Sequence, residues 1–375
     1  MNTKKFKLII ISGFYPIFKG GAEYQMRLIA DQLNDQFEIV FIYLGDIPGF
    51  EVAQSRYENI DGYKVYFLKS PTKIDQLFLR FFYSKRLFKI LKEENPDFVY
   101  QRVYKFISYY ISKFQKTLKF QHFIHIADLF TIEFKANTLR NKLNFKFFKN
   151  TAENESKFIV QTAEQEEILS RYDVKPVLQV YNMHPIVDLN IQYIASSKQI
   201  EKKKHIVWVA NIKPIKQLEI FLELATSFQN NDDVEFDIIG SVQDTIYANP
   251  LLEKIKTLNN VNHYTDKDNV FVNEFLLNNA FLVINTSKSE GFSNVFIQSW
   301  LRGIPVISLN SNPDNLFDKF SEFGKYCNNS IELLENYVVK MIDNDEYFQK
   351  SINCYERSRE LFSFKNIEKI KRLLK

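Results

Sequence analysis

The stretch Asn285-Thr-Ser-Lys-Ser-Glu-Gly-Phe-Ser-Asn-Val-Phe-Ile-Gln-Ser-Trp-Leu-Arg-Gly-Ile-Pro-Val-Ile307 decides the fold. It predicts an apolar strand over residues 281–285, then a polar loop, a helix over 294–302 and a second strand over 305–308. This alternation is typical of a parallel sheet. Ligands of such sheets bind beyond the carboxyl ends of the strands, and N–H groups at a helix start suit phosphate. We therefore expect a diphosphate in the loop before Asn294.

The same alternation of strands and helices extends along the rest of the chain. In the first half we predict strands over 7–11, 38–44, 98–101, 122–126, 158–161 and 176–181, and helices over 22–33, 106–118 and 163–171. A polar stretch, 188–204, is the expected linker, after which the pattern starts again with a strand over 205–210. The last part, 347–374, is strongly helical in pattern. The fold class is therefore α/β, with two Rossmann-like domains.

Composition and charge set limits on the class of protein. A chain of 375 residues suits two domains, and with 45% hydrophobic and 25% charged residues it is expected to fold as a soluble protein. Positive charge is concentrated in residues 64–149, which hold 18 basic and 6 acidic side chains. This basic, aromatic-rich half favours an anionic surface or acceptor. Nucleic acid is not an expected partner, because no other feature supports it.

Several functions are disfavoured by motifs that the sequence lacks. There is no Gly-x-Gly-x-x-Gly before the first helix and no Gly-x4-Gly-Lys-Ser/Thr, which disfavours NAD and ATP enzymes. Two cysteines, Cys327 and Cys354, are too few for a zinc cluster. Asp343 and Asp345 match an Asp-x-Asp metal motif, but on a helix two such residues point about 200° apart. We expect no metal and no cofactor.

The expected location is the cytoplasm, because no signal peptide and no stretch of about 18 apolar residues is visible. Segments 76–91 and 134–149 mix large apolar residues with Lys and Arg. Such segments can dock on the anionic inner face of the cell membrane. A packed helix with a solvated basic rim explains the same residues, so both interpretations stay open.

The decisive stretch resembles family 4 glycosyltransferases, which have the two-domain GT-B fold. Glu290 and Gln298 match its Glu-x7-Glu signature with glutamine as the second member, and Gly303-Ile-Pro-Val matches the strand that follows. The resemblance implies that Glu290 binds sugar hydroxyls and that Gln298 holds the ribose as a neutral partner. It also implies that Gly291, Phe292, Ser293 and Asn294 offer backbone N–H groups to the diphosphate.

Three further segments carry the resemblance. Residues 207–219 are similar to the family's Gly-Arg-Leu-x3-Lys-Gly segment, with Lys216 at the Lys position and Asn211 in place of Arg; Lys213 is a candidate substitute cation. Gly20 and Gly21 look like the N-terminal Gly–Gly loop that approaches the donor phosphate. His125 resembles the strand-end histidine near the reacting centre, although a structural histidine is a serious alternative.

The resemblance implies a retaining, metal-independent transferase. Its donor is expected to be a UDP- or GDP-hexose, and its acceptor a saccharide or a lipid-linked molecule, in assembly of a bacterial capsule, O-antigen or lipopolysaccharide. The expected domains are 1–185 for the acceptor and 200–355 for the donor, facing across a cleft, with a helix at 356–375 that returns to the first domain. The alternatives are a sugar-nucleotide 2-epimerase of the same fold and a non-catalytic subunit that binds nucleotide-sugar.

Overall fold

The computed structural model describes residues 5–45, 57–78, 80–134, 138–343 and 346–375, and it divides the chain into two compact units. Unit 1 is Met1–Met183 together with Lys365–Lys375, and unit 2 is His184–Phe364. The prediction that 188–204 is a linker is wrong, because Ile191–Ile200 forms helix α7 and packs in unit 2 on helix α14, Tyr347–Phe362. The returning segment starts at Lys365 instead of at 356.

Unit 1 is built on an eight-stranded sheet in the order β3-β4-β2-β1-β5-β6-β7-β8, parallel except for the β3–β4 pair. The strands are β1 Phe6–Ile11, β2 Phe37–Leu44, β3 Tyr57–Ile60, β4 Tyr63–Leu68, β5 Phe98–Arg102, β6 Gln121–His125, β7 Lys157–Val160 and β8 Leu178–Gln179. The helices are α1 Gly21–Leu33, α2 Lys73–Leu77, α3 Phe81–Glu94, α4 Ile107–Leu118, α5 Leu139–Glu153, α6 Ala163–Ser170 and α15 Lys365–Leu373.

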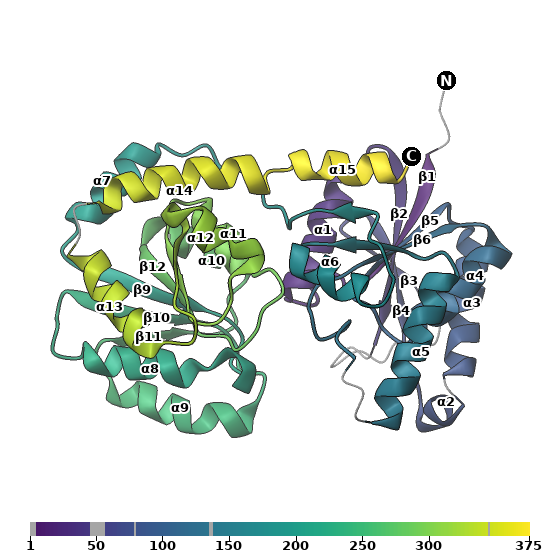
Figure 1. Cartoon of the computed structure of the whole chain (residues 1–375), viewed down its shortest axis with the longest axis horizontal. Coiled ribbons are helices and arrows are strands. Elements are labelled where there is room, and N and C mark those ends of the chain that lie inside the picture. The colour runs from purple at the N-terminus through teal and green to yellow at the C-terminus, as the bar shows by residue number, and fades with distance from the viewer. Residues whose placement is uncertain (1–4, 46–56, 79, 135–137, 344–345) are drawn as a thin grey trace. The chain divides into compact units, whose positions relative to one another are not determined.

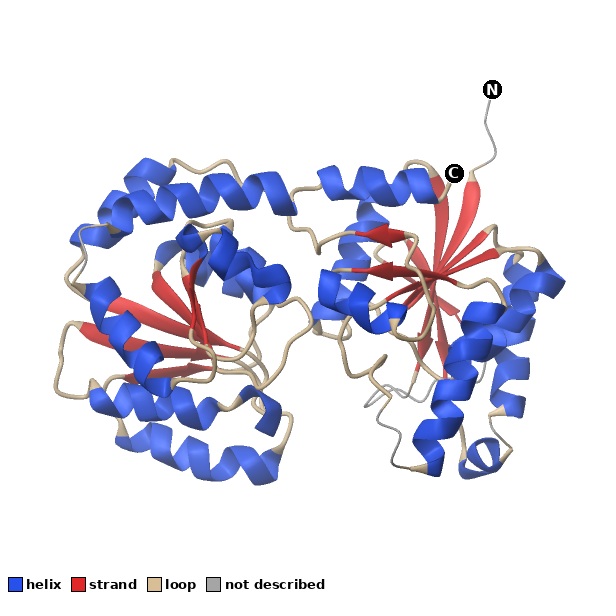
Figure 2. Cartoon of the chain, viewed as in Figure 1, coloured by secondary structure: helices blue, strands red, loops and turns tan. Residues whose placement is uncertain are grey.

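The unit 1 strands form because their residues are apolar on both faces of the sheet. In β1, Leu8, Ile9 and Ile10 are fully buried, as expected of a parallel strand that helices cover on both sides. Figure 2 shows helices on both faces of each sheet. After β1 the chain builds β2 and β4 on one side and then crosses to β5 on the other. The carboxyl ends of β1 and β5 therefore form a topological switch point, where open α/β sheets bind ligands.

Unit 2 is built on a six-stranded, wholly parallel sheet in the order β11-β10-β9-β12-β13-β14. The strands are β9 Lys204–Val209, β10 Val234–Ile239, β11 Val261–Tyr264, β12 Ala280–Asn285, β13 Val306–Ser308 and β14 Gly324–Tyr326. Besides α7 and α14, the helices are α8 Leu218–Ser227, α9 Thr245–Thr257, α10 Asn269–Asn278, α11 Asn294–Trp300, α12 Leu316–Lys319 and α13 Ile331–Ile342, with 3-10 turns η1 Pro214–Lys216, η2 Pro313–Asn315 and η3 Ser321–Phe323.

The unit 2 sheet has its own switch point. The chain runs from β9 to β10 and β11 on one side and then places β12 on the other side of β9. The loops after β9 and β12 therefore leave the same edge of the sheet as neighbours. This edge carries the stretch that decided the fold.

Every strand and helix predicted above from sequence is present, with ends shifted by a few residues. The 347–374 stretch is two helices, α14 and α15, with the break at Ser363 and Phe364. The hairpin β3–β4 was not predicted. Asp345 of the Asp-x-Asp motif lies outside the described residues. Among those that are described, no helix is both long enough and apolar enough to cross a bilayer.

Candidate functional site

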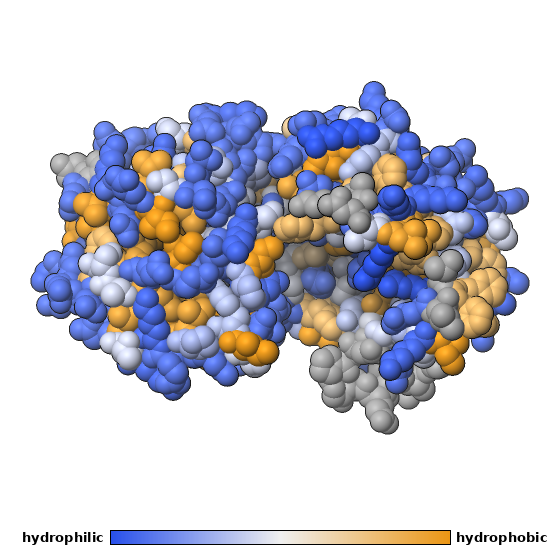
Figure 3. Space-filling model, turned by 60° about the horizontal axis from the view of Figure 1, so that its bottom comes forward, coloured by the Kyte–Doolittle hydropathy of each residue, from blue (hydrophilic) through white to orange (hydrophobic). Residues whose placement is uncertain are grey.

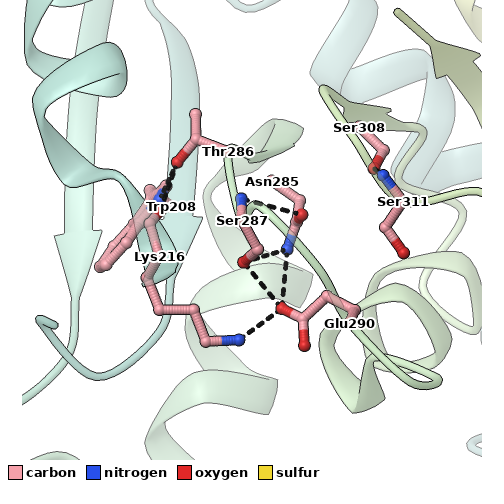
Figure 4. Close-up of polar contacts among 8 residues, drawn as sticks. All are labelled: Trp208, Lys216, Asn285, Thr286, Ser287, Glu290, Ser308 and Ser311. Carbon is pink, nitrogen blue, oxygen red and sulfur yellow. Dashed lines mark hydrogen bonds and ion pairs between the residues drawn. The ribbon is translucent and has the colours of Figure 1, made fainter. Parts of the chain in front are cut away.

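Two loops of unit 2 are bound together at its switch point. The loop after β9 ends in η1, and the loop after β12 covers residues 286–293. Thr286 Oγ1 donates a 2.7 Å hydrogen bond to the carbonyl oxygen of Lys216, and Trp208 Nε1 donates to Thr286 Oγ1 at 3.0 Å (Figure 4). The Lys288 amide donates to the Ile215 carbonyl at 2.9 Å. These bonds hold both loops in one arrangement.

The locked loops bring together Lys216 and Glu290, which are 74 residues apart in the sequence. Lys216 Nζ and Glu290 Oε1 form an ion pair, and Figure 4 shows the two side chains extending toward each other. The same oxygen accepts hydrogen bonds from Ser287 Oγ at 2.8 Å and Asn285 Nδ2 at 3.3 Å. Oε2 has no hydrogen bond to any residue that the structure describes. The side chains are 18% and 15% exposed, so a ligand can reach both.

The loop after β9 also places Asn211 and Lys213 at this edge, both half-buried. The pKa of Lys213 is lowered, mainly because burial penalises its charged form and then because Lys216 repels it; Glu290 acts in the opposite direction. Lys216 pairs with Glu290, and the ammonium of Lys213 feels the charges of both. The arrangement suits an anion, which would relieve the repulsion between the two ammonium groups.

The turn that opens α11 follows Glu290 directly. Ser293 is the N-cap, and its side chain does not cap the helix. Gly291 is half-buried, whereas the ring of Phe292 is buried and packs edge-on against Phe362 at 5.5 Å between centroids. The side chain of Asn294 hydrogen-bonds His184. The side chains on this turn are thus largely engaged inside unit 2, so any contact of theirs with a diphosphate would come from backbone N–H groups.

Gln298 lies deeper than its expected role suggests. Its side chain is only 1% exposed, and Nε2 donates to Asn273 Oδ1 at 2.9 Å and Asn269 Oδ1 at 3.3 Å on α10. A hydrogen bond from this amide to a ribose would require it to leave α10.

The remaining candidates lie at the corresponding edge of unit 1. His125 ends β6 and is 2% exposed; its Nδ1 is 2.7 Å from Tyr100 Oη, and Nε2 has no partner among the described residues. Burial, and then the nearby Arg102, keep the pKa of His125 well below its usual value, so the ring is neutral. Gly20 is the N-cap of α1, and Gly21 is its first residue. All three are therefore beyond or at the ends of strands in unit 1.

Sequence reasoning did not identify Asn285 and Ser287, which hold Glu290, or Thr286, which joins the two loops. A usable signal existed: all three polar residues come at the end of a buried strand. Ser308, which ends β13 and accepts from the Ser311 amide at 3.2 Å, follows the same rule.

Comparisons with known proteins agree with the fold of the chain. The profile of the family described as glycosyl transferases group 1 matches residues 191–359. Sucrose-phosphate synthase from Thermosynechococcus elongatus has a TM-score of 0.75 at 14% identity, with 98% of each chain covered. HepE from Anabaena, solved with UDP-glucose, has a TM-score of 0.72 at 15% identity, with 98% of this chain and 99% of HepE covered.

A third solved structure, S. aureus TarM in complex with Fondaparinux, alpha-GlcNAc-glycerol and UDP, has a TM-score of 0.70 at 13% identity, with 98% of this chain and 99% of TarM covered. The search of curated proteins finds no match. The solved structures share the GT-B fold along nearly the whole chain, and the family profile covers the unit that holds Lys216 and Glu290. Residues 191–359 therefore match the group 1 glycosyl transferases, and the chain as a whole has the GT-B fold.

Proposed function

We propose that this protein is a glycosyltransferase that transfers a hexose, with retention of anomeric configuration, from a nucleotide-sugar to a saccharide or lipid-linked acceptor. The observation that supports this best is the Lys216–Glu290 pair at the unit 2 switch point, with Lys213 beside it. UDP is favoured over GDP as the nucleotide, because HepE and TarM were both solved with UDP or a UDP-sugar.

In the proposed mechanism, unit 2 binds the donor. Lys216 pairs with the diphosphate and stabilises the negative charge that develops on it as the glycosidic bond breaks. Glu290 is then released from Lys216 and accepts hydrogen bonds from sugar hydroxyls. Backbone N–H groups of 291–294 contribute to phosphate binding, and Asn211 is a secondary donor contact. Gln298 would donate to the ribose only after its amide leaves Asn269 and Asn273.

The proposal needs no metal and no cofactor, because Lys213 and Lys216 supply positive charge where a divalent ion would otherwise act. His125, with Gly20 and Gly21, is proposed to contact the sugar and acceptor side of the reaction from unit 1. Neutral at physiological pH, His125 would act as a hydrogen-bonding group through Nε2 and not as a cation.

The proposed setting is assembly of a bacterial surface polysaccharide at the inner face of the cell membrane. Exposed aromatic residues on α2 and α3 support peripheral contact: Phe78, Phe81 and Phe82 are 55%, 45% and 47% exposed. Lys85 lies 4.4 Å above the Phe81 ring, so cationic and aromatic groups share this surface. Such a combination suits an anionic lipid headgroup region.

Nucleotide binding tests the proposal. UDP and a panel of nucleotide-sugars should raise the thermal stability of the protein, by about 2.7 kcal/mol at a hundred times Kd. Lys216→Ala should weaken UDP binding by roughly 10- to 100-fold, the size of a lost charge-assisted hydrogen bond. Lys202→Ala is the matched control, since Lys202 is 85% exposed in the same unit.

Two results would contradict the proposal: no nucleotide-sugar binds at millimolar concentration, or Lys216→Ala binds UDP as the wild type does. Product analysis then separates the alternatives. Free sugar-nucleotide products without an acceptor would indicate a 2-epimerase, and binding with neither hydrolysis nor transfer would indicate a non-catalytic subunit. The departures at Asn211 and Gln298 make this second measurement necessary.

A further inference from the structure

Unit 1 contains a pocket of about 950 Å³ that no part of the donor site uses. It lies beyond the carboxyl ends of β5 and β6, because residues 104–106 follow β5 directly and 130–134 come shortly after β6. The start of α5 and Arg80, before α3, complete its walls. It is therefore at the edge of the sheet where an α/β unit binds small molecules.

The described residues that line the pocket carry an excess of positive charge. Arg80, Lys105 and Arg140 line it, with one acid, the exposed Glu133. None of the three cations forms an ion pair with a described residue. The buried acids of this region are engaged elsewhere: Asp75 with Arg86 at 3.0 Å, and Glu94 with Lys64 at 2.6 Å. This excess of positive charge would suit an anion.

Arg80 is held in the pocket at a conformational cost. Its φ of 61° is in the left-handed region, which costs a non-glycine residue about 1–2 kcal/mol. The capping box between Thr72 and Asp75 fixes the turn of α2 before it, and Asp75 is itself anchored by Arg86. The guanidinium lies 5.4 Å from the centre of the Phe106 ring. Strained residues that the surrounding structure fixes are concentrated at binding sites.

Apolar side chains form the rim of the same pocket. Phe130, Leu139 and Leu143 line it and are 58%, 76% and 41% exposed. Figure 3 shows exposed hydrophobic residues interleaved with hydrophilic ones on the face that it brings forward. Basic walls beside an apolar rim complement a molecule with an anionic head and a hydrocarbon tail, whereas a free acidic saccharide would leave the rim exposed to water.

We propose that this pocket binds the phosphate of a lipid-linked acceptor, with Arg80, Lys105 and Arg140 as the phosphate contacts and the apolar rim against the lipid chain. The inference rests on the proposed function, because it names the class of acceptor for that reaction. It assigns the acceptor head to residues that the family signature does not include.

Calorimetric titration with octyl phosphate, below its micelle concentration, tests the proposal on the full chain. The protein should bind octyl phosphate at least about tenfold more tightly than octyl glucoside, which lacks the phosphate, or inorganic phosphate, which lacks the alkyl chain. The double variant Lys105→Glu/Arg140→Glu should lose at least about tenfold in affinity. Both positions precede or begin a helix, where an acid is tolerated.

Lys142→Glu/Lys146→Glu is the matched control, because both lysines are exposed on α5, do not line the pocket and change the charge equally. It should bind octyl phosphate like the wild type. The proposal is overturned if both double variants lose affinity for octyl phosphate equally. It is also overturned if octyl glucoside, inorganic phosphate or glucuronate, which represents a free acidic saccharide, binds as tightly as octyl phosphate. UDP binding to each variant is measured in parallel. If the wild type did not bind UDP, the proposed function would be contradicted, whereas the binding of octyl phosphate in the pocket would still be tested by the variants.

Discussion

One oxygen of Glu290 accepts hydrogen bonds from three donors, while the other oxygen is left to solvent or ligand. This asymmetry would allow an acid to lie beside the proposed diphosphate site without repelling its ligand. Lys216 neutralises the carboxylate, and in the proposed mechanism a diphosphate would compete for the same ammonium. Glu290 would then be free to turn toward the sugar. The pair is therefore expected to respond to both parts of the donor.

Glu290→Gln tests this exchange. The amide keeps the shape but loses the charge that attracts sugar hydroxyls, so kcat/KM for the donor should fall by about 10- to 100-fold, the value of one charged hydrogen bond. UDP alone should bind at least as well as to the wild type, because Lys216 no longer has an internal partner. Glu253→Gln, 72% exposed in the same unit, serves as control. Unchanged turnover at all donor concentrations would rule out the role.

Buried histidines in unit 1 predict loss of stability in acid. Burial lowers the pKa of His122 to about 3, and His125 is also held well below 6.5. Below pH 6.5 the unfolded chain binds protons at these two histidines, whereas the folded unit keeps them neutral. The free energy of unfolding should therefore fall as the pH falls below 6.5, by about 1.4 kcal/mol per pH unit for each histidine that stays neutral, and for His122 this fall continues toward pH 3. Urea unfolding at several pH values measures the slope. His122→Gln should reduce this slope by about 1.4 kcal/mol per pH unit, the contribution of one histidine. An unchanged slope would show that His122 is not held neutral in the folded unit.

The sequence singled out Glu290 and Lys216, because each matches a position in one of two separate family motifs, and the structure pairs their side chains. The sequence could not place Gln298, since a residue four positions into a helix can face either a ligand or a neighbouring helix, and here α10 offers Asn269 and Asn273. The sequence showed that residues 64–149 are rich in basic side chains, but not which of them line the pocket. Arg80 precedes α3 and Arg140 lies in the first turn of α5, and only the folded chain brings both to one pocket.

At the scale of elements, the donor loops depend on how closely β9 and β10 end together. A Cβ on Gly240, which follows β10, would lie 1.7 Å from the carbonyl oxygen of Ala210, which follows β9. The loops after β9 and β10 are also joined by a 2.9 Å hydrogen bond from the Ile212 amide to the Ser241 carbonyl oxygen. The backbone that carries Lys213 and Lys216 therefore passes over a position where only glycine fits.

Gly240→Ala should displace this loop and destabilise unit 2 by roughly 1–3 kcal/mol or more, because the clash is with backbone that has no rotamer to change. UDP affinity should fall with it. Gly62→Ala is the contrasting variant, since φ there is +82° but no atom lies within 4 Å of the added Cβ. It should cost about 1 kcal/mol and leave UDP binding unchanged. Equal effects of the two variants on UDP binding would contradict the argument.

Elements with both faces buried were easy to predict, and the others were not. Residues 8–11 of β1 and 280–284 of β12 are continuous apolar runs, which are typical of a parallel strand covered on both faces. Helix α7 was mistaken for a linker because one of its few buried positions is Lys198, whose ammonium donates to the carbonyl oxygens of Leu276 and Ala280. In a sequence, a buried lysine that binds carbonyl oxygens at the end of another helix cannot be distinguished from a solvent-exposed one. The edge strand β3 has too few apolar residues to be distinguished from a loop.

At the scale of the whole molecule, unit 1 is discontinuous. Its sheet is complete by Val180, yet α15 returns from the far end of the sequence and packs on α1 (Figure 1). Ile367, Ile370 and Leu374 are almost completely buried there. Unit 1 can therefore reach its full stability only once the last residues of the chain have been made, whereas unit 2 is encoded in one continuous stretch.

A chain that ends at Phe364 should therefore lose stability in unit 1 alone. Each buried Ile or Leu removed from a core costs about 2–5 kcal/mol, so even Ile370→Ala should lower the unit 1 transition measurably. Both tryptophans, Trp208 and Trp300, are in unit 2, so tryptophan fluorescence follows unit 2 while far-UV circular dichroism follows both units. The truncated chain should show an early transition by circular dichroism and an unchanged one by fluorescence, with Lys369→Ala, exposed on the same helix, as control. If the fluorescence transition moved as far as the other, α15 would be stabilising unit 2, and the assignment of 365–375 to unit 1 would be wrong.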